Sequence, residues 1–191
     1  MRDALQVHRA LLEAGVPHGV ERLRRPVASA EELPDVLGVP PERCVVVRCY
    51  TAGGGTVAVA VPAGSEPRPA ALRRALHADD VGPAGDAEVN AATDCAARLV
   101  SPVGLPAGVE LLLDAALVVE GPLWVATGDA GTAVQLSGID LLAVSGARVV
   151  ALAEPVAPVT VTVPPVAAGG AQEGRPGAVR SLPGPLAAAG R

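Results

Sequence analysis

Two apolar runs on either side of a glycine turn constrain the fold of this chain more than any other feature. Residues 44–51 read Cys-Val-Val-Val-Arg-Cys-Tyr-Thr, a run of three glycines follows at 53–55, and residues 57–62 read Val-Ala-Val-Ala-Val-Pro. This pattern predicts a β-hairpin. Because Arg48 is charged and lies inside the first run, its side chain either reaches to water or faces a site that requires positive charge.

Shorter amphipathic segments surround the hairpin without a regular alternation of strands and helices. A capping-box pattern at residues 29–32 predicts a helix that ends at Gly38, and Pro34 leaves open a later start at Leu33. The whole pattern predicts an α/β (α+β-like) fold, with a mixed, partly antiparallel sheet and short helices packed on it. The other expected helices are 3–14, 69–77, 86–97 and 139–144, and the other expected strands are 20–25, 109–113, 123–127, 132–136 and 148–152.

Composition divides the chain into two parts. From residue 154 to residue 191 the sequence is rich in Pro, Ala, Gly and Val and carries five charged residues. Such a segment buries too little apolar surface to offset its ordering entropy. We therefore expect one domain over 1–153 and a mostly disordered tail over 154–191. Alternating valines at 159, 161 and 163 leave one extra edge strand open.

The absence of particular residues excludes several kinds of chemistry. Every basic residue is Arg, so a phosphate loop ending in Gly-Lys-Ser/Thr and a lysine Schiff base are both impossible. A net charge of −5 argues against a protein that coats nucleic acid, although local contact with one RNA end remains open. Cys44, Cys49 and Cys95 are too few for a disulfide framework, and no apolar signal core or spanning helix is predicted, so we expect a cytoplasmic protein.

Several short motifs follow one another along the chain. They are Leu37-Gly38-Val39-Pro40-Pro41 before the 44–51 strand, Ser101-Pro102-Val103-Gly104, Asp114 at a strand end, and Gly128-x-x-Gly131 before Leu136 and Ile139-Asp140-Leu141. Their order and spacing resemble the YbaK/ProX family of aminoacyl-tRNA deacylases, which are relatives of the editing domain of prolyl-tRNA synthetase. The resemblance covers about residues 3–152, and Arg48 stands at the position of the family's strand lysine.

The resemblance implies a hydrolase that cleaves a wrong amino acid, a small one such as Ala or Cys, from the 3′ end of tRNA. Arg48 is the implied catalytic residue. The implied partners are the aminoacyl-tRNA 3′ end and a synthetase, with no membrane and no DNA, and no metal or cofactor is implied. The residues implied to bind substrate are His18, Tyr50, Leu99, Ser101, Pro102, Gly104, Asp114, Gly128 and Gly131.

Each of these side chains also has a simpler interpretation. A guanidinium does not deprotonate, so Arg48 cannot be a general base, but it can bind phosphate or stabilise an oxyanion. It can equally form a plain ion pair, for example with Asp114. Asp114 can instead cap the following turn, His18 can be an exposed loop residue, and the glycines at 128 and 131 can serve turn geometry.

Two other functions remain open. The chain can be a binding module that keeps the fold without hydrolysis, because it lacks the family's lysine and reads Asp-Cys-Ala-Ala-Arg-Leu-Val over 94–100, where the family has glycines. It can also be an unrelated α/β protein. If the chain contacts an RNA backbone, exposed arginines would make that contact. Because acidic residues lie close to them in the sequence, these arginines can equally form an ordinary solvated surface. These arginines are Arg22, Arg24, Arg25, Arg73 and Arg74.

Overall fold

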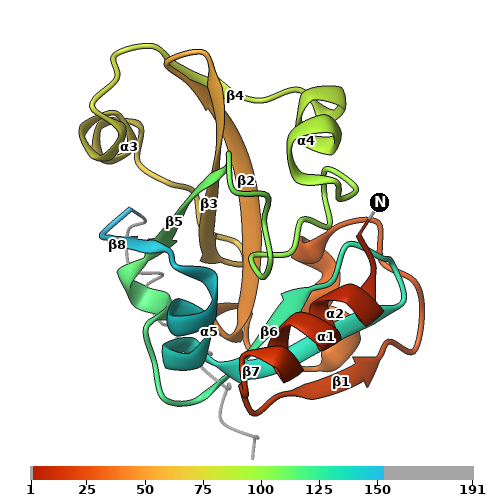
Figure 1. Cartoon of the computed structure of the whole chain (residues 1–191). Helices are drawn as coiled ribbons and strands as arrows, with labels where there is room; N and C mark the ends of the chain where they lie inside the picture. The colour runs from red at the N-terminus through yellow and green to blue at the C-terminus, as the bar shows by residue number, and fades with distance from the viewer. Residues whose placement is uncertain (1, 153–191) are drawn as a thin grey trace, which may run out of the picture. The chain divides into compact units, whose positions relative to one another are not determined.

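The structure is a computed structural model that describes residues 2–152. Short helices alternate irregularly with strands along the chain (Figure 1). The helices are α1 (Ala4–Glu13), α2 (Leu33–Leu37), α3 (Pro69–Leu76), α4 (Asp86–Thr93) and α5 (Gly138–Ser145), with 3-10 turns η1 (Ala30–Glu32), η2 (Pro41–Arg43) and η3 (Ala115–Leu117). The strands are β1 (Gly19–Arg22), β2 (Cys44–Ala52), β3 (Gly55–Pro62), β4 (Val81–Pro83), β5 (Glu110–Asp114), β6 (Pro122–Ala126), β7 (Thr132–Ser137) and β8 (Arg148–Val150).

The strands form one mixed sheet in the order β1-β7-β6-β2-β3-β5-β8, and β4 pairs with β2 outside this path. The β1–β7, β6–β7, β2–β3 and β2–β4 pairs are antiparallel, whereas β2–β6, β3–β5 and β5–β8 are parallel. The mixed, partly antiparallel sheet that the sequence predicted is therefore confirmed.

The central hairpin forms where the glycine turn predicted it. Gly53 and Gly54 have φ angles of 56° and 81°, a backbone region that residues with a side chain rarely adopt. The turn sets a register in which Arg48 lies opposite Val59. Arg48 thus occupies the middle of the most central strand pair.

The other edge of β2 is shared between two short partners. Cys44 and Val45 pair with β6, and the far end of the strand, from Tyr50 onward, pairs with β4. Between these contacts, residues 46–49 have no strand neighbour on that edge. The sequence did not predict β4, because three residues that include Gly82 and Pro83 carry no strand pattern.

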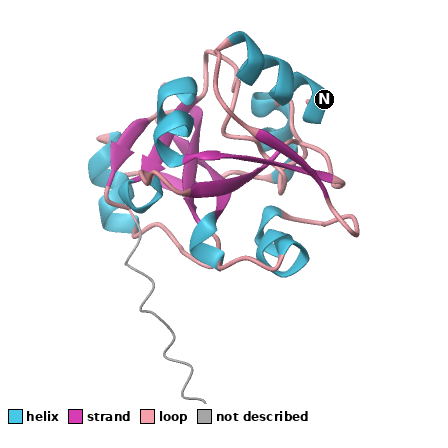
Figure 2. Cartoon of the chain, turned by 90° about the horizontal axis from the view of Figure 1, so that it is seen from below, coloured by secondary structure: helices cyan, strands magenta, loops and turns pink. Residues whose placement is uncertain are grey.

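Side chains of β2 alternate between two cores on opposite faces of the sheet. Val45, Val47 and Cys49 belong to a core that α1, α4 and α5 cover, with Val7, Val89 and Leu141 among its members. Cys44 and Val46 belong to a second core with Leu33 of α2 and Leu99. Figure 2 shows helices on both sides of the sheet. Aliphatic side chains thus fill both cores without any Phe.

Several predicted helices and strands begin or end at other residues than expected. The helix expected over 86–97 ends at Thr93, because Asp94 adopts a φ of 55°. The capping box does not form: α2 begins at Leu33, and Ser29 makes no side-chain capping bond. The strand expected over 20–25 ends at Arg22. The tail and its alternating valines lie outside the described residues. No helix within residues 2–152 is long and apolar enough to cross a membrane.

Candidate functional site

A cavity of about 330 Å³ lies along the part of β2 that has no strand partner on one edge. Its walls come from residues 46–49 of β2, from Asp86 and Val89 of α4, from Glu31 of η1, and from the loop residues Ala97 and Arg98. Figure 1 shows α4 and the loop that follows it beside β2. The cavity therefore exists because the sheet is split at this point.

The split also leaves backbone polar groups of β2 facing the cavity. The Cys49 carbonyl accepts a hydrogen bond from the Ala84 N–H at 3.0 Å, so residue 49 directs its backbone groups away from β3. Because backbone direction alternates along an antiparallel strand, Val47 directs its N–H and carbonyl the same way. The strand edge at Val47 can therefore hydrogen-bond a ligand that enters the cavity.

The Arg48 side chain is held by acidic residues on the face of the sheet that carries η1. Its Nη2 atom lies 2.5 Å from Glu31 Oε1 and 3.0 Å from Glu66 Oε1, and it donates to the Ser65 carbonyl at 3.3 Å. Both carboxylates thus engage the same guanidinium nitrogen. Arg48 thus forms an ion pair, but the suggested partner Asp114 was wrong, and the partners are Glu31 and Glu66.

A second nitrogen of the same guanidinium has no partner. Arg48 Nε is buried and has no hydrogen-bond acceptor within the described part of the chain. A buried donor without an acceptor costs roughly 1–3 kcal/mol. Arg48 is also one of the residues that line the cavity.

Glu31 fixes the geometry of this arrangement from two sides. Its Oε2 accepts a hydrogen bond from the Gly64 N–H at 2.9 Å while its Oε1 contacts Arg48. The backbone next to Glu31 is anchored as well, because the Ala30 N–H donates to the Arg98 carbonyl at 2.9 Å. Glu31 therefore connects η1, β2 and the turn after β3.

Two charged side chains of the cavity have no polar partner within residues 2–152. Neither the Arg98 guanidinium nor the Asp86 carboxylate forms an ion pair or a side-chain hydrogen bond there. Both are exposed, and neither was among the predicted site residues. The sequence signal for Arg98 was its place directly before Leu99, in the segment where the resembling family has glycines.

The cysteine in the cavity wall is not a nucleophile. Burial, with a smaller contribution from Cys95, raises the pKa of the Cys49 thiol to about 11. Cysteine attacks as its thiolate, which this environment suppresses at neutral pH. Across residues 2–152 no group of three or more His, Cys, Asp or Glu side chains could hold a metal ion.

The predicted loop residues near Ser101 lie in the protein interior. Ser101 is fully buried and its Oγ accepts a hydrogen bond from the Val103 N–H at 3.2 Å. Pro102 is buried beside it, and Leu99, 6% exposed, packs in the second core. None of these three side chains lines the cavity at Arg48.

The predicted glycines lie next to the N-terminal segment. Both Gly104 and Gly128 face Arg2 so closely that a Cβ at either position would lie 2.6 Å from an Arg2 atom. Their φ angles of 72° and 92° also favour glycine. Gly131 donates its N–H to Asp129 Oδ1 at 2.8 Å, within the turn between β6 and β7. Gly104 and Gly128 thus lie where the backbone conformation favours glycine, whereas a Cβ at Gly131 would meet only the Asp129 side chain, at 3.7 Å.

Neither Asp114 nor Tyr50 lines the cavity at Arg48. The Asp114 carboxylate accepts hydrogen bonds from the N–H groups of Ala116 and Leu152, both at 2.8 Å, so it caps η3 and holds the chain after β8. Tyr50 packs against the core that β3 and α3 share, and burial raises the pKa of its phenol.

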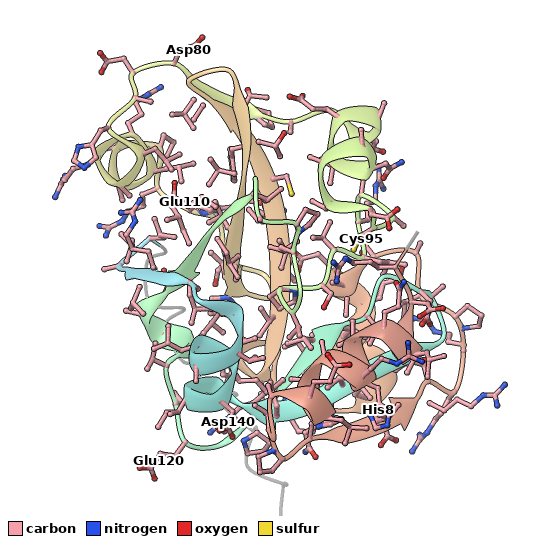
Figure 3. The ribbon with its side chains drawn as sticks, in the orientation of Figure 1. His8, Asp80, Cys95, Glu110, Glu120 and Asp140 are labelled. Atoms are coloured by element: carbon pink, nitrogen blue, oxygen red, sulfur yellow. The ribbon has the colours of Figure 1, made fainter. Side chains whose placement is uncertain are left out.

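His18 belongs to a different region. Its Nδ1 donates to the Val16 carbonyl at 2.7 Å, and its Nε2 shares a hydrogen bond of 2.7 Å with His8 Nδ1. It lines a separate cavity of about 480 Å³ together with Glu120 and Asp140. Figure 3 shows these two acidic residues in the lower part of the view, and His8 on α1.

The exposed arginines that were candidates for RNA contact remain at the surface. Arg25 pairs with Glu32 at 2.7 Å, and Arg73 donates from Nε to the Asp79 carbonyl at 3.1 Å. Arg22, Arg24 and Arg74 are also exposed. A role for these side chains in RNA binding stays a prediction.

Sequence comparison identifies one family for most of the folded region. The model of the "Aminoacyl-tRNA editing domain" family matches residues 24–144. This match includes β2, η1, α4 and the loop that contains Arg98. No curated protein matches the chain.

Solved structures share the fold over nearly their whole length. The structure named "Crystal structure of hypothetical protein APE2540" has a TM-score of 0.72 and 22% identity, covering 78% of this chain and 99% of that one. One named "Crystal structure of a putative trans-editing enzyme for prolyl tRNA synthetase" has a TM-score of 0.70 and 24% identity, covering 80% and 97%. A scaffold from a study of epitope backbone grafting has a TM-score of 0.70 and 26% identity, covering 80% and 97%.

Proposed function

Because the chain belongs to the aminoacyl-tRNA editing domain family, we propose that it hydrolyses the ester of a mischarged tRNA that carries a small amino acid such as Ala or Cys. Editing of this kind is needed because a synthetase pocket cannot reject a similar or smaller amino acid by binding alone. A solved structure with the same fold is named "a putative trans-editing enzyme for prolyl tRNA synthetase", which supports this function and a synthetase as a further partner.

The observation that carries the proposal is the unpaired Nε of Arg48. Nη2 is already neutralised by two carboxylates, so Arg48 contributes a directed hydrogen-bond donor rather than a free charge. A buried donor of this kind stabilises negative charge that develops on an ester carbonyl oxygen. The apolar wall made by Val46, Ala84 and Val89 suits a small aliphatic side chain.

The reaction needs no covalent intermediate on the protein. The oxygen of a water molecule attacks the ester carbonyl, and the carbonyl oxygen takes up the negative charge beside Arg48. The bond to the ribose oxygen then breaks, which releases the free amino acid and the tRNA hydroxyl. Arg48 cannot accept the water's proton, so bulk solvent or a group of the substrate takes it.

A binding module without hydrolysis is the second candidate. One observation in its favour is that Glu31 and Glu66 together neutralise the charge of Arg48. A second is that Arg98 and Leu99 lie in the segment where the family that the sequence resembles has glycines. In this case the cavity would hold an aminoacyl-tRNA end without cleaving it.

Deacylation of a panel of mischarged tRNAs separates the two candidates. We expect the natural chain to deacylate at least one small aminoacyl-tRNA, and Arg48→Ala to lower the rate roughly 100-fold or more, as when an oxyanion donor is removed. Arg9→Ala, an exposed change on α1, is the matched control and should leave the rate unchanged. If the natural chain is inactive on every substrate and Arg48→Lys gains activity, the binding module is the correct function.

A further inference from the structure

We propose that the cavity recognises its ligand by two opposite charges, with Arg98 binding the phosphodiester of the 3′-terminal nucleotide and Asp86 binding the α-ammonium of the attached amino acid. This inference rests on the proposed function, because it assumes that the ligand is an aminoacyl-tRNA end. It adds a substrate requirement, namely a free amino group, and assigns roles to two residues that neither the family match nor the structural neighbours assign.

Arg98 is the available cation of this cavity. Arg48 already contacts Glu31 and Glu66, whereas the Arg98 side chain has no polar partner within residues 2–152. Its backbone is nevertheless fixed, because the Arg98 carbonyl accepts from the Ala30 N–H at 2.9 Å and the next residue, Leu99, is anchored in the second core. A guanidinium on a rigid backbone presents a planar pair of donors that matches two phosphate oxygens.

Asp86 is the available carboxylate of the same cavity. Glu31 is already engaged by Arg48 and by the Gly64 N–H. Asp86 begins α4 and lines the cavity without an ion pair in the described residues. A primary ammonium group of a ligand would complete its hydrogen bonding.

The two residues approach the cavity from different elements. Asp86 comes from α4, the helix that covers the core containing Val47, whereas Arg98 is bonded to η1 near the core containing Val46. Both side chains nevertheless line the same cavity. An aminoacyl nucleotide carries its ammonium and its phosphodiester on opposite sides of the ester, so one ligand in this cavity can engage both residues.

Binding of amide-linked analogues tests the assignment without requiring hydrolysis. The probes are 3′-alanylamino-3′-deoxyadenosine 5′-monophosphate, the same compound without its phosphate, and the same compound with an acetylated amino group. Arg98→Gln and Asp86→Asn are compared with the exposed controls Arg9→Gln and Asp80→Asn, after thermal melting has shown that each variant is folded.

Each variant should lose affinity only for probes that carry the matching charge. We expect Arg98→Gln to weaken binding of the full probe roughly 10- to 100-fold and to leave the phosphate-free probe unchanged. Asp86→Asn should weaken the full probe by a similar factor and leave the acetylated probe unchanged. The control variants should bind every probe like the natural chain.

Several outcomes would overturn the assignment. These are equal losses for charged and uncharged probes, no loss in either variant, or no binding of any probe by the natural chain. Deacylation is measured separately, so the two proposals can fail independently. If each variant loses affinity only for the probe with the matching charge but no tRNA is deacylated, hydrolysis is rejected and the roles of Arg98 and Asp86 stand. If tRNA is deacylated but the losses do not follow the charges of the probes, the roles of Arg98 and Asp86 are rejected and hydrolysis stands.

Discussion

Arg48 is tolerated in the middle of a largely buried strand because two carboxylates match its charge. Its hydrogen bonding is nevertheless incomplete. One nitrogen, Nη2, contacts both Glu31 and Glu66, which offsets the cost of taking the cation out of water. Nε remains a buried donor without an acceptor. Such unsatisfied groups are rare in folded proteins and are frequent features of functional sites.

Glu31 acts on Arg48 as a positioning residue. Glu31→Gln keeps an oxygen that can accept from the Gly64 N–H but removes the charge that faces Arg48. We expect the free energy of unfolding to fall by about 1 kcal/mol, because the pair is only partly buried. We also expect kcat for deacylation to fall several-fold with little change in KM.

The matched control for this prediction is Glu66→Gln. Glu66 contacts the same nitrogen from a side chain that is 71% exposed, so its loss should cost less stability and less activity than the loss of Glu31. Urea unfolding and steady-state deacylation of both variants measure these effects. A larger effect at Glu66 than at Glu31 would contradict the assignment.

At the level of elements, the split edge of β2 creates the cavity. β6 pairs with the start of β2 and β4 with its end, and the residues between them are left to face α4 and the loop that contains Arg98. A continuous strand in this place would fill the gap with backbone. The site thus depends on two short strands ending where they do.

A second element junction depends on a single glycine. Gly138 begins α5 directly after β7, and its N–H donates to the Val119 carbonyl at 2.9 Å. A Cβ at this position would overlap the Leu117 carbonyl and approach the Val119 N atom to 2.7 Å. The obstacles are backbone atoms, so no side-chain rotation can relieve the overlap.

We therefore expect Gly138→Ala to be strongly destabilising. The free energy of unfolding should fall by about 3 kcal/mol or more, at or beyond the upper end of typical overpacking costs. Gly108→Ala is the matched control, because a Cβ there meets no atom within 4 Å. Thermal or urea unfolding of the two variants measures the difference, and similar stabilities would show that the β7–α5 junction is more plastic than this geometry indicates.

For the described part of the molecule as a whole, stability rests on aliphatic packing that also encloses thiols. Cys44 is fully buried, and burial raises the pKa of its thiol from 9.0 to about 12. Burial likewise raises the pKa of the Cys49 thiol to about 11. Below pH 9 both the folded and the unfolded chain hold these protons, so the contribution of the buried thiols to stability is fully present. Above pH 9 the unfolded chain releases its protons first, and stability is lost.

The free energy of unfolding should therefore decrease as pH rises from about 9 towards 12. For Cys44 alone, a rise of this size corresponds to at most about 4 kcal/mol. Urea unfolding at pH 8, 9, 10 and 10.5 measures the slope. Cys44→Ala should be less stable at pH 8 because of the cavity it leaves, but it should show a shallower slope. A stability that stays constant up to pH 10.5 would refute this prediction.

Local sequence determined most of the elements of this protein, although β4 was not predicted. The hairpin follows from two apolar runs and a glycine turn, α1 and α3 follow from amphipathic helical patterns, and the positive charge in the strand follows from Arg48 itself. Each of these features depends on residues that are close together in the chain, where propensity and turn chemistry act directly.

Only the tertiary structure decided which residues surround Arg48. Pairing of Cys44 with Trp124 and of Tyr50 with Pro83 joins distant parts of the chain, and these pairings open the gap that becomes the cavity. Glu31 and Arg98 enter the site for the same reason, whereas none of the predicted loop residues lines it. Such contacts depend on how whole elements pack, and no short-range pattern in the sequence encodes that packing.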